Sequence, residues 1–122
     1  MLKFKFLLWM MPKLMQRAIN TKPACARYVA GKNLEFQIQT LDKIGRYFRI
    51  QDGKVNSFAG LTMTPKFTLT FRNADRGFKI LSAKDGKEAF LAALHDEDLV
   101  ISGDFVEVLW FQGFTDYLQS GK

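Results

Sequence analysis

The sequence is poor in the residues that most catalytic and metal sites require. It contains one cysteine, Cys25, and one histidine, His95. One cysteine excludes an internal disulfide, and one residue of each type leaves no partner for a zinc site or a Cys–His nucleophile. His95 precedes the acidic run 96–98 at a predicted helix end, where a solvent-exposed side chain is expected. We therefore predict no catalytic residue, no metal and no cofactor.

Several sequence motifs are also absent. There is neither a P-loop nor a Gly-x-Gly-x-x-Gly run, and Ser102 lacks the glycine on both sides that a nucleophile elbow needs. No EF-hand spacing surrounds the acidic run 96–98. The apolar run 6–11 is too short to span a bilayer, and we interpret it as part of the mature protein. These absences argue against an enzyme.

Acidic residues are missing from the start of the chain. Seven cations precede the first acid, Glu35, so this segment carries the whole excess of the net charge of +6. Bulky apolar side chains stand between these cations, which is more typical of a helix at a membrane surface than of a nucleic-acid interface. We predict no nucleic-acid partner and a peripheral membrane contact through Lys3, Lys5, Trp9, Lys13 and Arg17.

Phenylalanine, in contrast, is abundant. The chain has 12 phenylalanines but only three tyrosines and two tryptophans. Because phenylalanine has no polar group, it serves packing or apolar contact rather than hydrogen-bonded recognition. Two interpretations stay open at this point: a phenylalanine-rich solid core, or a core that is partly hollow or partly ligand.

Hydrophobic periodicity predicts one α+β domain over residues 1–122, with 1–20 as an apolar, basic helix that Pro12 could bend. A short second helix ends near Val29. Alternating residues then predict four strands, at 34–39, 45–51, 54–59 and 67–71, with a hairpin turn at Asp52-Gly53. We expect three or four consecutive antiparallel strands with helices on one face.

The C-terminal part is predicted to be mainly helical. Residues 75–82 are ambiguous because Gly77 interrupts them, and Asp85 with Glu88 predicts the start of a helix to His95. A short strand at 99–101 then leads to a final helix, capped by Asp104 and running to about Gln119.

The final helix is apolar around most of its circumference. Packing against a sheet requires one apolar stripe of about 100°. Its second apolar face must therefore meet a ligand, another subunit, a membrane or the N-terminal helix. The apolar residues are Phe105, Val106, Val108, Leu109, Trp110, Phe111, Phe114, Tyr117 and Leu118.

The run Asp98-Leu-Val-Ile-Ser-Gly-Asp104, followed by an apolar helix, resembles the closing signature of the sterol carrier protein 2 domain family, bacterial stand-alone type. The order of predicted elements agrees from about residue 10 to 119. The resemblance implies a mainly antiparallel five-stranded sheet with helices on one face. It also implies non-covalent binding, transfer or presentation of a lipid between the sheet and the C-terminal helix. Some bacterial relatives are accessory factors in quinone biosynthesis, which we keep as a sub-hypothesis.

The resemblance also implies a ligand class and a site. The ligand would be a sterol, a fatty acyl chain or an isoprenoid or quinone, held in an apolar cavity. The predicted cavity residues are Phe67, Leu69, Phe71, Phe90, Leu94, Ile101, Phe105, Leu109, Trp110 and Phe114. The chain ends without the peroxisomal address of eukaryotic sterol carriers, so we expect a cytoplasmic location, peripheral at the inner face of a membrane. The alternative is an interaction module whose C-terminal helix mediates homodimerisation or membrane or partner docking; a basic nucleic-acid binder is a weaker alternative.

Overall fold

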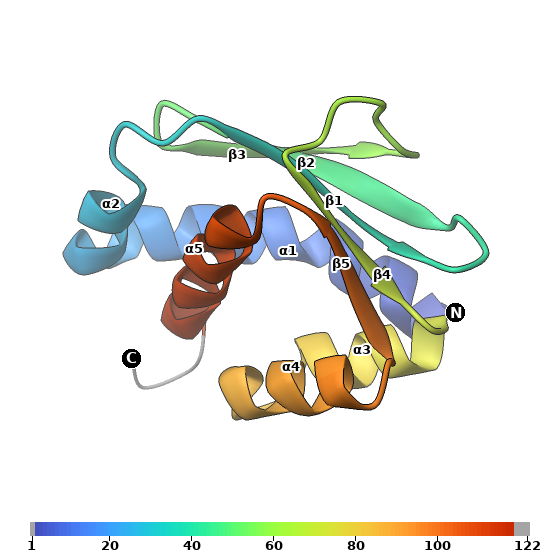
Figure 1. Ribbon diagram of the computed structural model, residues 1–122. Coiled ribbons are helices and arrows are strands. Elements are labelled where there is room, and N and C mark those ends of the chain that lie inside the picture. The colour runs from blue at the N-terminus through green and yellow to red at the C-terminus, as the bar shows by residue number, and fades with distance from the viewer. Residues whose placement is uncertain (1, 119–122) are drawn as a thin grey trace.

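A five-stranded sheet covered on one face by helices makes up the computed structural model, which describes residues 2–118 (Figure 1). The helices are α1 (Leu2–Thr21), α2 (Pro23–Val29), α3 (Ala74–Leu81), α4 (Gly86–His95), α5 (Phe105–Thr115) and the 3-10 turn η1 (Asp116–Leu118). The strands are β1 (Leu34–Thr40), β2 (Gly45–Gln51), β3 (Lys54–Ala59), β4 (Phe67–Phe71) and β5 (Leu99–Gly103). The predicted α+β class with five strands is confirmed, although Gln119, the predicted end of the last helix, lies outside the described residues.

The sheet has the order β3-β2-β1-β4-β5. The first three strands form the expected antiparallel meander, and Asp52 and Gly53 take the positive φ angles, 54° and 74°, that their tight turn needs. The prediction that β4 could extend this meander is wrong, because β4 pairs in parallel with β1. Residues 60–66 return the chain past β1, where the Lys66 amide donates to the Glu35 carbonyl, and so set β4 on the other side of β1. β5 then pairs antiparallel with β4.

The two faces of the sheet differ in chemistry. The outer face carries polar pairs, such as Gln37 donating to the Thr68 hydroxyl at 3.0 Å. The inner face is apolar and meets the helices, so the core lies between these two layers (Figure 1). Its fully buried side chains come from the three strands β1, β2 and β4 and from α1 and α5: Phe4, Leu8, Met15, Phe36, Ile38, Phe48, Ile50, Phe67, Leu69, Phe71, Phe111 and Phe114.

Helix α1 stays a single helix through Pro12. Its buried residues Leu8, Met11 and Met15 lie on both sides of the proline, and packing against the sheet holds both halves in line. α3 is likewise continuous, which corrects the predicted interruption at Gly77. A Cβ at Gly77 would lie 2.5 Å from a ring carbon of Phe4, so this glycine lets α3 pack closely on α1. No helix within residues 2–118 combines the length and apolarity needed to cross a bilayer.

Candidate functional site

Helix α5 covers one part of the inner sheet face and is placed by its N-cap. Asp104 follows β5, and its carboxylate accepts from the amides of Val106 and Glu107 at 3.0 and 3.4 Å, as predicted for the start of this helix. Val108, Phe111 and Phe114 then fall on one face and are fully buried. This face of α5 packs on the sheet.

Beneath α5 the interior is filled by aromatic rings. The Phe36 ring on β1 lies 4.9 Å from Phe67 on β4 and 4.9 Å from Phe111 on α5, between ring centroids. The predicted cavity residues Phe67, Leu69, Phe71 and Phe114 are all fully buried within this packed core. Of the two interpretations of the phenylalanine content, the solid core therefore describes this conformation.

A small cavity lies between α3, α4 and α5. Its volume is about 30 Å³, and its lining is Ile80, Leu81, Gly86, Phe90, Phe111, Gln112 and Thr115. This is room for about one water molecule, whereas ordinary ligand pockets begin near 300 Å³. The predicted residue Phe90 is among its walls, while Leu94 and Ile101 are half-buried against the core. A molecule of the size of a lipid therefore does not fit into this cavity in the present conformation.

Two lining residues of this cavity, Gln112 and Thr115, are polar, and the Thr115 hydroxyl donates to the Gln112 carbonyl. The Gln112 side-chain nitrogen Nε2 is buried and donates no hydrogen bond to any described residue. Such a buried donor costs about 1–3 kcal/mol unless something accepts from it. Apolar periodicity does not identify Gln112; its signal in the sequence is a lone amide within an otherwise apolar stretch of helix.

The outer face of α5 is exposed. Phe105 and Leu109, both predicted to line the cavity, are 52% and 53% exposed, and the neighbouring Val106 is 71% exposed. Phe105 and Leu109 are four residues apart and share this outer face, because the sheet takes the face of Val108 and Phe111. In this conformation neither side chain reaches the interior.

Trp110, also a predicted cavity residue, contacts α2 instead. The Tyr28 ring stacks on it at 5.3 Å, and the Tyr28 hydroxyl donates to the Trp110 carbonyl at 2.8 Å. Lys32, just after α2, pairs with Glu107 and lies 4.8 Å from the Trp110 ring centroid. Burial raises the pKa of the Tyr28 hydroxyl, and Tyr117 and Asp116 add to this rise. Part of the second apolar face of α5 is thus covered by α2, an element absent from the expected alternatives.

The predicted membrane-surface residues share the exposed side of α1. Lys3, Lys5, Trp9, Lys13 and Arg17 are all exposed. Phe6, also exposed, lies 5.9 Å from Trp9 between ring centroids, and the Lys13 ammonium is 4.0 Å from the Trp9 ring centroid. Aromatic and cationic groups therefore stand together on this helix, as in helices that lie at a membrane surface.

No family model and no curated protein matches this sequence. Several solved structures, in contrast, are similar to this chain. A "UbiJ-SCP2 Ubiquinone synthesis protein" has a TM-score of 0.69 at 13% identity, with 94% of this chain and 97% of that chain covered. The apo form of sterol carrier protein 2 from Yarrowia lipolytica has a TM-score of 0.55 at 12% identity, covering 95% and 94%.

A third likeness is to part of a larger enzyme. The sec-alkylsulfatase Pisa1 from Pseudomonas sp. has a TM-score of 0.57 at 14% identity, and 79% of this chain corresponds to 14% of that one. The sheet order, the helical layer and near-complete coverage of two proteins named for this domain lead to one conclusion. The chain has the sterol carrier protein 2 fold.

Proposed function

We propose that this protein binds a lipid non-covalently between the inner sheet face and α5, in an open state in which α5 has moved away from α3 and α4. The observation that carries the proposal is the small cavity at the junction of these three helices, with the unsatisfied Nε2 of Gln112 in its wall. An oxygen of the lipid head group accepts from Gln112, and the apolar chain enters beside Phe90 and Phe111.

Apolar burial supplies the driving force for such binding. Each Å² of apolar lipid surface removed from water contributes about 25 cal/mol. The opening has a cost, because rings packed on Phe111 must separate. The exposed face of α5 reduces that cost, since Phe105, Val106 and Leu109 have few native contacts to lose. The lipid chain then makes the apolar contacts that the inner face of α5 loses when the helix moves away.

We propose that no chemistry accompanies binding. The two nucleophilic or basic candidates are unsuited to it: His95 is exposed, and Cys25 is fully buried. Burial raises the pKa of the Cys25 thiol, with Lys22 acting weakly against it, so the reactive thiolate is disfavoured. The fold similarity to a ubiquinone synthesis protein supports an isoprenoid or quinone-type ligand ahead of a sterol or a fatty acyl chain.

The test is to plug the cavity without disturbing the fold. Gly86 lines the cavity, and a Cβ placed there faces open space, with no atom within 4 Å apart from its chain neighbours and the backbone of its own helix. Gly86→Leu is expected to fold and to lower the affinity for a fluorescent fatty acid such as cis-parinaric acid at least tenfold. Gly86→Ala is the matched control and should change it less than threefold. Equal uptake by the leucine variant and the wild type would place the lipid elsewhere.

The exposed face of α5 favours a second candidate, docking of this helix on another protein copy or on a membrane. Phe105, Val106 and Leu109 form an apolar patch that no described residue covers. Light scattering over a range of concentrations, with Val106→Asp for comparison, distinguishes the two. Docking on a second copy predicts a dimer that the variant loses, and docking on a membrane predicts vesicle binding that the variant loses. Interior binding predicts unchanged lipid uptake in Val106→Asp.

A further inference from the structure

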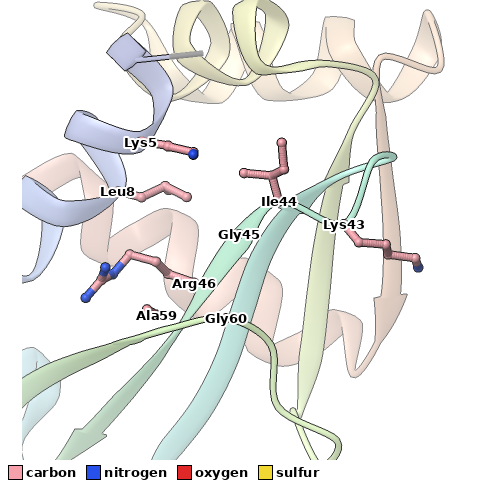
Figure 2. A pocket seen from close by; sticks show the side chains of 8 residues that line it. All are labelled: Lys5, Leu8, Lys43, Ile44, Gly45, Arg46, Ala59 and Gly60. Atoms are coloured by element: carbon pink, nitrogen blue, oxygen red, sulfur yellow. The ribbon is translucent and has the colours of Figure 1, made fainter.

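An open pocket lies at the edge of the molecule between α1 and β2 (Figure 2). Its volume is about 380 Å³, and it shares no lining residue with the cavity beneath α5. The first half of α1 forms one wall, and the β1–β2 turn with the end of β3 forms the other. Its lining is Lys5, Leu8, Lys43, Ile44, Gly45, Arg46, Ala59 and Gly60.

Cations without carboxylate partners characterise this pocket. Three of its eight lining residues, Lys5, Lys43 and Arg46, are basic and none is acidic. None of the three forms an ion pair within residues 2–118. Arg46 Nε and Nη2 both donate to the Ser57 hydroxyl, at 3.2 and 3.1 Å, which orients the guanidinium without neutralising it. The pocket therefore favours an anion.

The other lining residues of this pocket are apolar side chains or glycines. Leu8 is almost fully buried beneath the pocket, and Ile44 stands beside it. Figure 2 shows Lys5 and Leu8 extending from α1 towards β2, with Ile44 on the opposite side and Lys43 pointing away from α1. Gly45 must be glycine, because a Cβ there would lie 2.2 Å from the Ile38 carbonyl oxygen. An apolar chain can thus contact Leu8 and Ile44 while its charged end meets Lys5 and Arg46.

A second groove continues the same edge. It has a volume of about 320 Å³, also contains Arg46, and again has no acidic residue in its lining: Trp9, Pro12, Lys13, Gln16, Arg46, Val55, Asn56 and Ser57. Arg46 is therefore shared between a site with Lys5 and a site with Lys13. This places cations along the side of α1 next to the exposed rings of Phe6 and Trp9.

We propose that this edge binds the anionic head group of a lipid, a phosphate or carboxylate joined to an apolar chain, between Lys5 and Arg46. Leu8 and Ile44 contact the first carbons of the chain. The site is separate from the cavity beneath α5, and it stands whether or not that cavity takes a lipid. The anion can belong to a membrane lipid or to a free amphiphile, and the two sources are distinguishable.

The first experiment measures binding of the whole chain to vesicles by co-sedimentation. Phosphatidylcholine vesicles with phosphatidylglycerol are compared with pure phosphatidylcholine. Because each basic residue near an anionic surface contributes about fivefold in affinity, Lys5→Gln/Arg46→Gln is expected to weaken binding to the anionic vesicles at least tenfold. The control Lys84→Gln/Lys87→Gln removes the same charge from an exposed region and should weaken it less than threefold.

A second variant covers the case in which loss of Arg46 disturbs β2 and β3. Ala59 is exposed in the pocket wall, so Ala59→Glu adds a carboxylate while leaving all three cations in place. Ala59→Glu should weaken binding to the anionic vesicles to the same extent as the double variant, and its melting temperature should equal that of the wild type. Retained vesicle binding in Ala59→Glu and in the double variant overturns the proposal, as does an equal loss in the lysine control.

A soluble probe identifies the source of the anion. Octyl phosphate is titrated while the amide signals of Gly45 and Gly60 are followed by NMR. Saturable shifts that the double variant loses support a free amphiphile as ligand. Vesicle binding that depends on Lys5 and Arg46, with no response to octyl phosphate, supports a membrane lipid. No dependence on these two residues in either assay refutes the site.

Discussion

Gln112 lines the cavity between α3, α4 and α5, and its side-chain donor has no hydrogen-bond partner in the packed core. Its Nε2 is buried among apolar neighbours and has no acceptor within the described residues. We predict that Gln112→Leu raises the free energy of unfolding by up to about 1 kcal/mol, because a buried unpaired donor is removed. The same change should weaken binding of a lipid with an oxygen-bearing head group about tenfold. Urea unfolding and a fluorescence titration measure the two effects, and unchanged affinity would contradict the role given to Gln112.

Glu35 should make the free energy of unfolding depend on pH, because its pKa is lowered in the folded protein. Hydrogen bonds from the Arg49 side chain, at 2.8 and 3.2 Å, are the main cause of its lowered pKa; the Thr62 and Thr64 hydroxyls add to it, and burial partly opposes it. Because the folded pKa is the lower one, the stabilisation is complete above the unfolded pKa of about 4.3 and is lost as the pH falls through the folded value.

The corresponding variant is Glu35→Gln. At pH 7 it should lower the free energy of unfolding by roughly 1 kcal/mol, the upper range for a partly exposed ion pair. At pH 3 the difference between wild type and variant should be smaller, because protonation of Glu35 increases as the pH falls through its lowered folded pKa. Denaturant unfolding at both pH values checks this, and a difference that is independent of pH would show that the charge of Glu35 contributes nothing.

At the scale of elements, α2 holds α5 in place. Tyr28 stacks on Trp110, donates to its carbonyl and lies against Gly113, where a Cβ would be 2.3 Å from the Tyr28 hydroxyl oxygen. Because this contact must break when α5 moves away from the core, we expect it to limit that movement. In the proposed function it therefore controls the rate of lipid entry.

A double-mutant cycle tests this contact. Gly113→Ala should lower the free energy of unfolding by about 1–3 kcal/mol through overpacking against Tyr28 and should speed lipid uptake, because α2 and α5 are forced apart. In the Tyr28→Phe background the hydroxyl is gone, and the same alanine should cost less. Stopped-flow uptake and urea unfolding provide the readouts. Equal costs in both backgrounds would show that the two helices are not in contact here.

Most elements could be predicted from the sequence, because their signals are local. The Asp52-Gly53 turn, the Asp85 and Asp104 caps and the alternating strands each depend on neighbouring residues. The parallel pairing of β4 with β1 could not be predicted, since alternation shows which residues face the core but not which strand lies alongside. Gly77 was misread for a similar reason: what matters there is the Phe4 ring, 73 positions earlier in the chain.

The candidate site could be predicted only in part. Periodicity indicated that α5 has two apolar faces, and it has. It could not show that α2 covers Trp110, or that Phe105 and Leu109 stay exposed. Gln112 is polar, so apolar periodicity does not identify it, and its place in the cavity wall follows only from the structure. Which residues contact a lipid depends on how the helices separate, and that is a property of the whole molecule.

At the scale of the whole molecule, a solid phenylalanine core lies within the sterol carrier protein 2 fold. The rings of Phe36, Phe67 and Phe111 fill the space between the sheet and α5 in which we propose that a lipid binds. Both observations hold if the interior is closed without lipid and opens at α5 to receive it. The second, cationic site near Lys5 and Arg46 then lies at a separate edge, along α1, where contact with an anionic surface leaves α5 free to move.

Native mass spectrometry tests the central claim most directly. The protein is mixed in turn with a long-chain fatty acid, a sterol and an isoprenoid quinone, and its mass is recorded with Gly86→Leu as the control. We expect one bound lipid per wild-type chain for at least one of the three classes, and much less bound lipid in Gly86→Leu. A wild-type protein that takes up none of the three, or a Gly86→Leu variant that takes up as much, would contradict it.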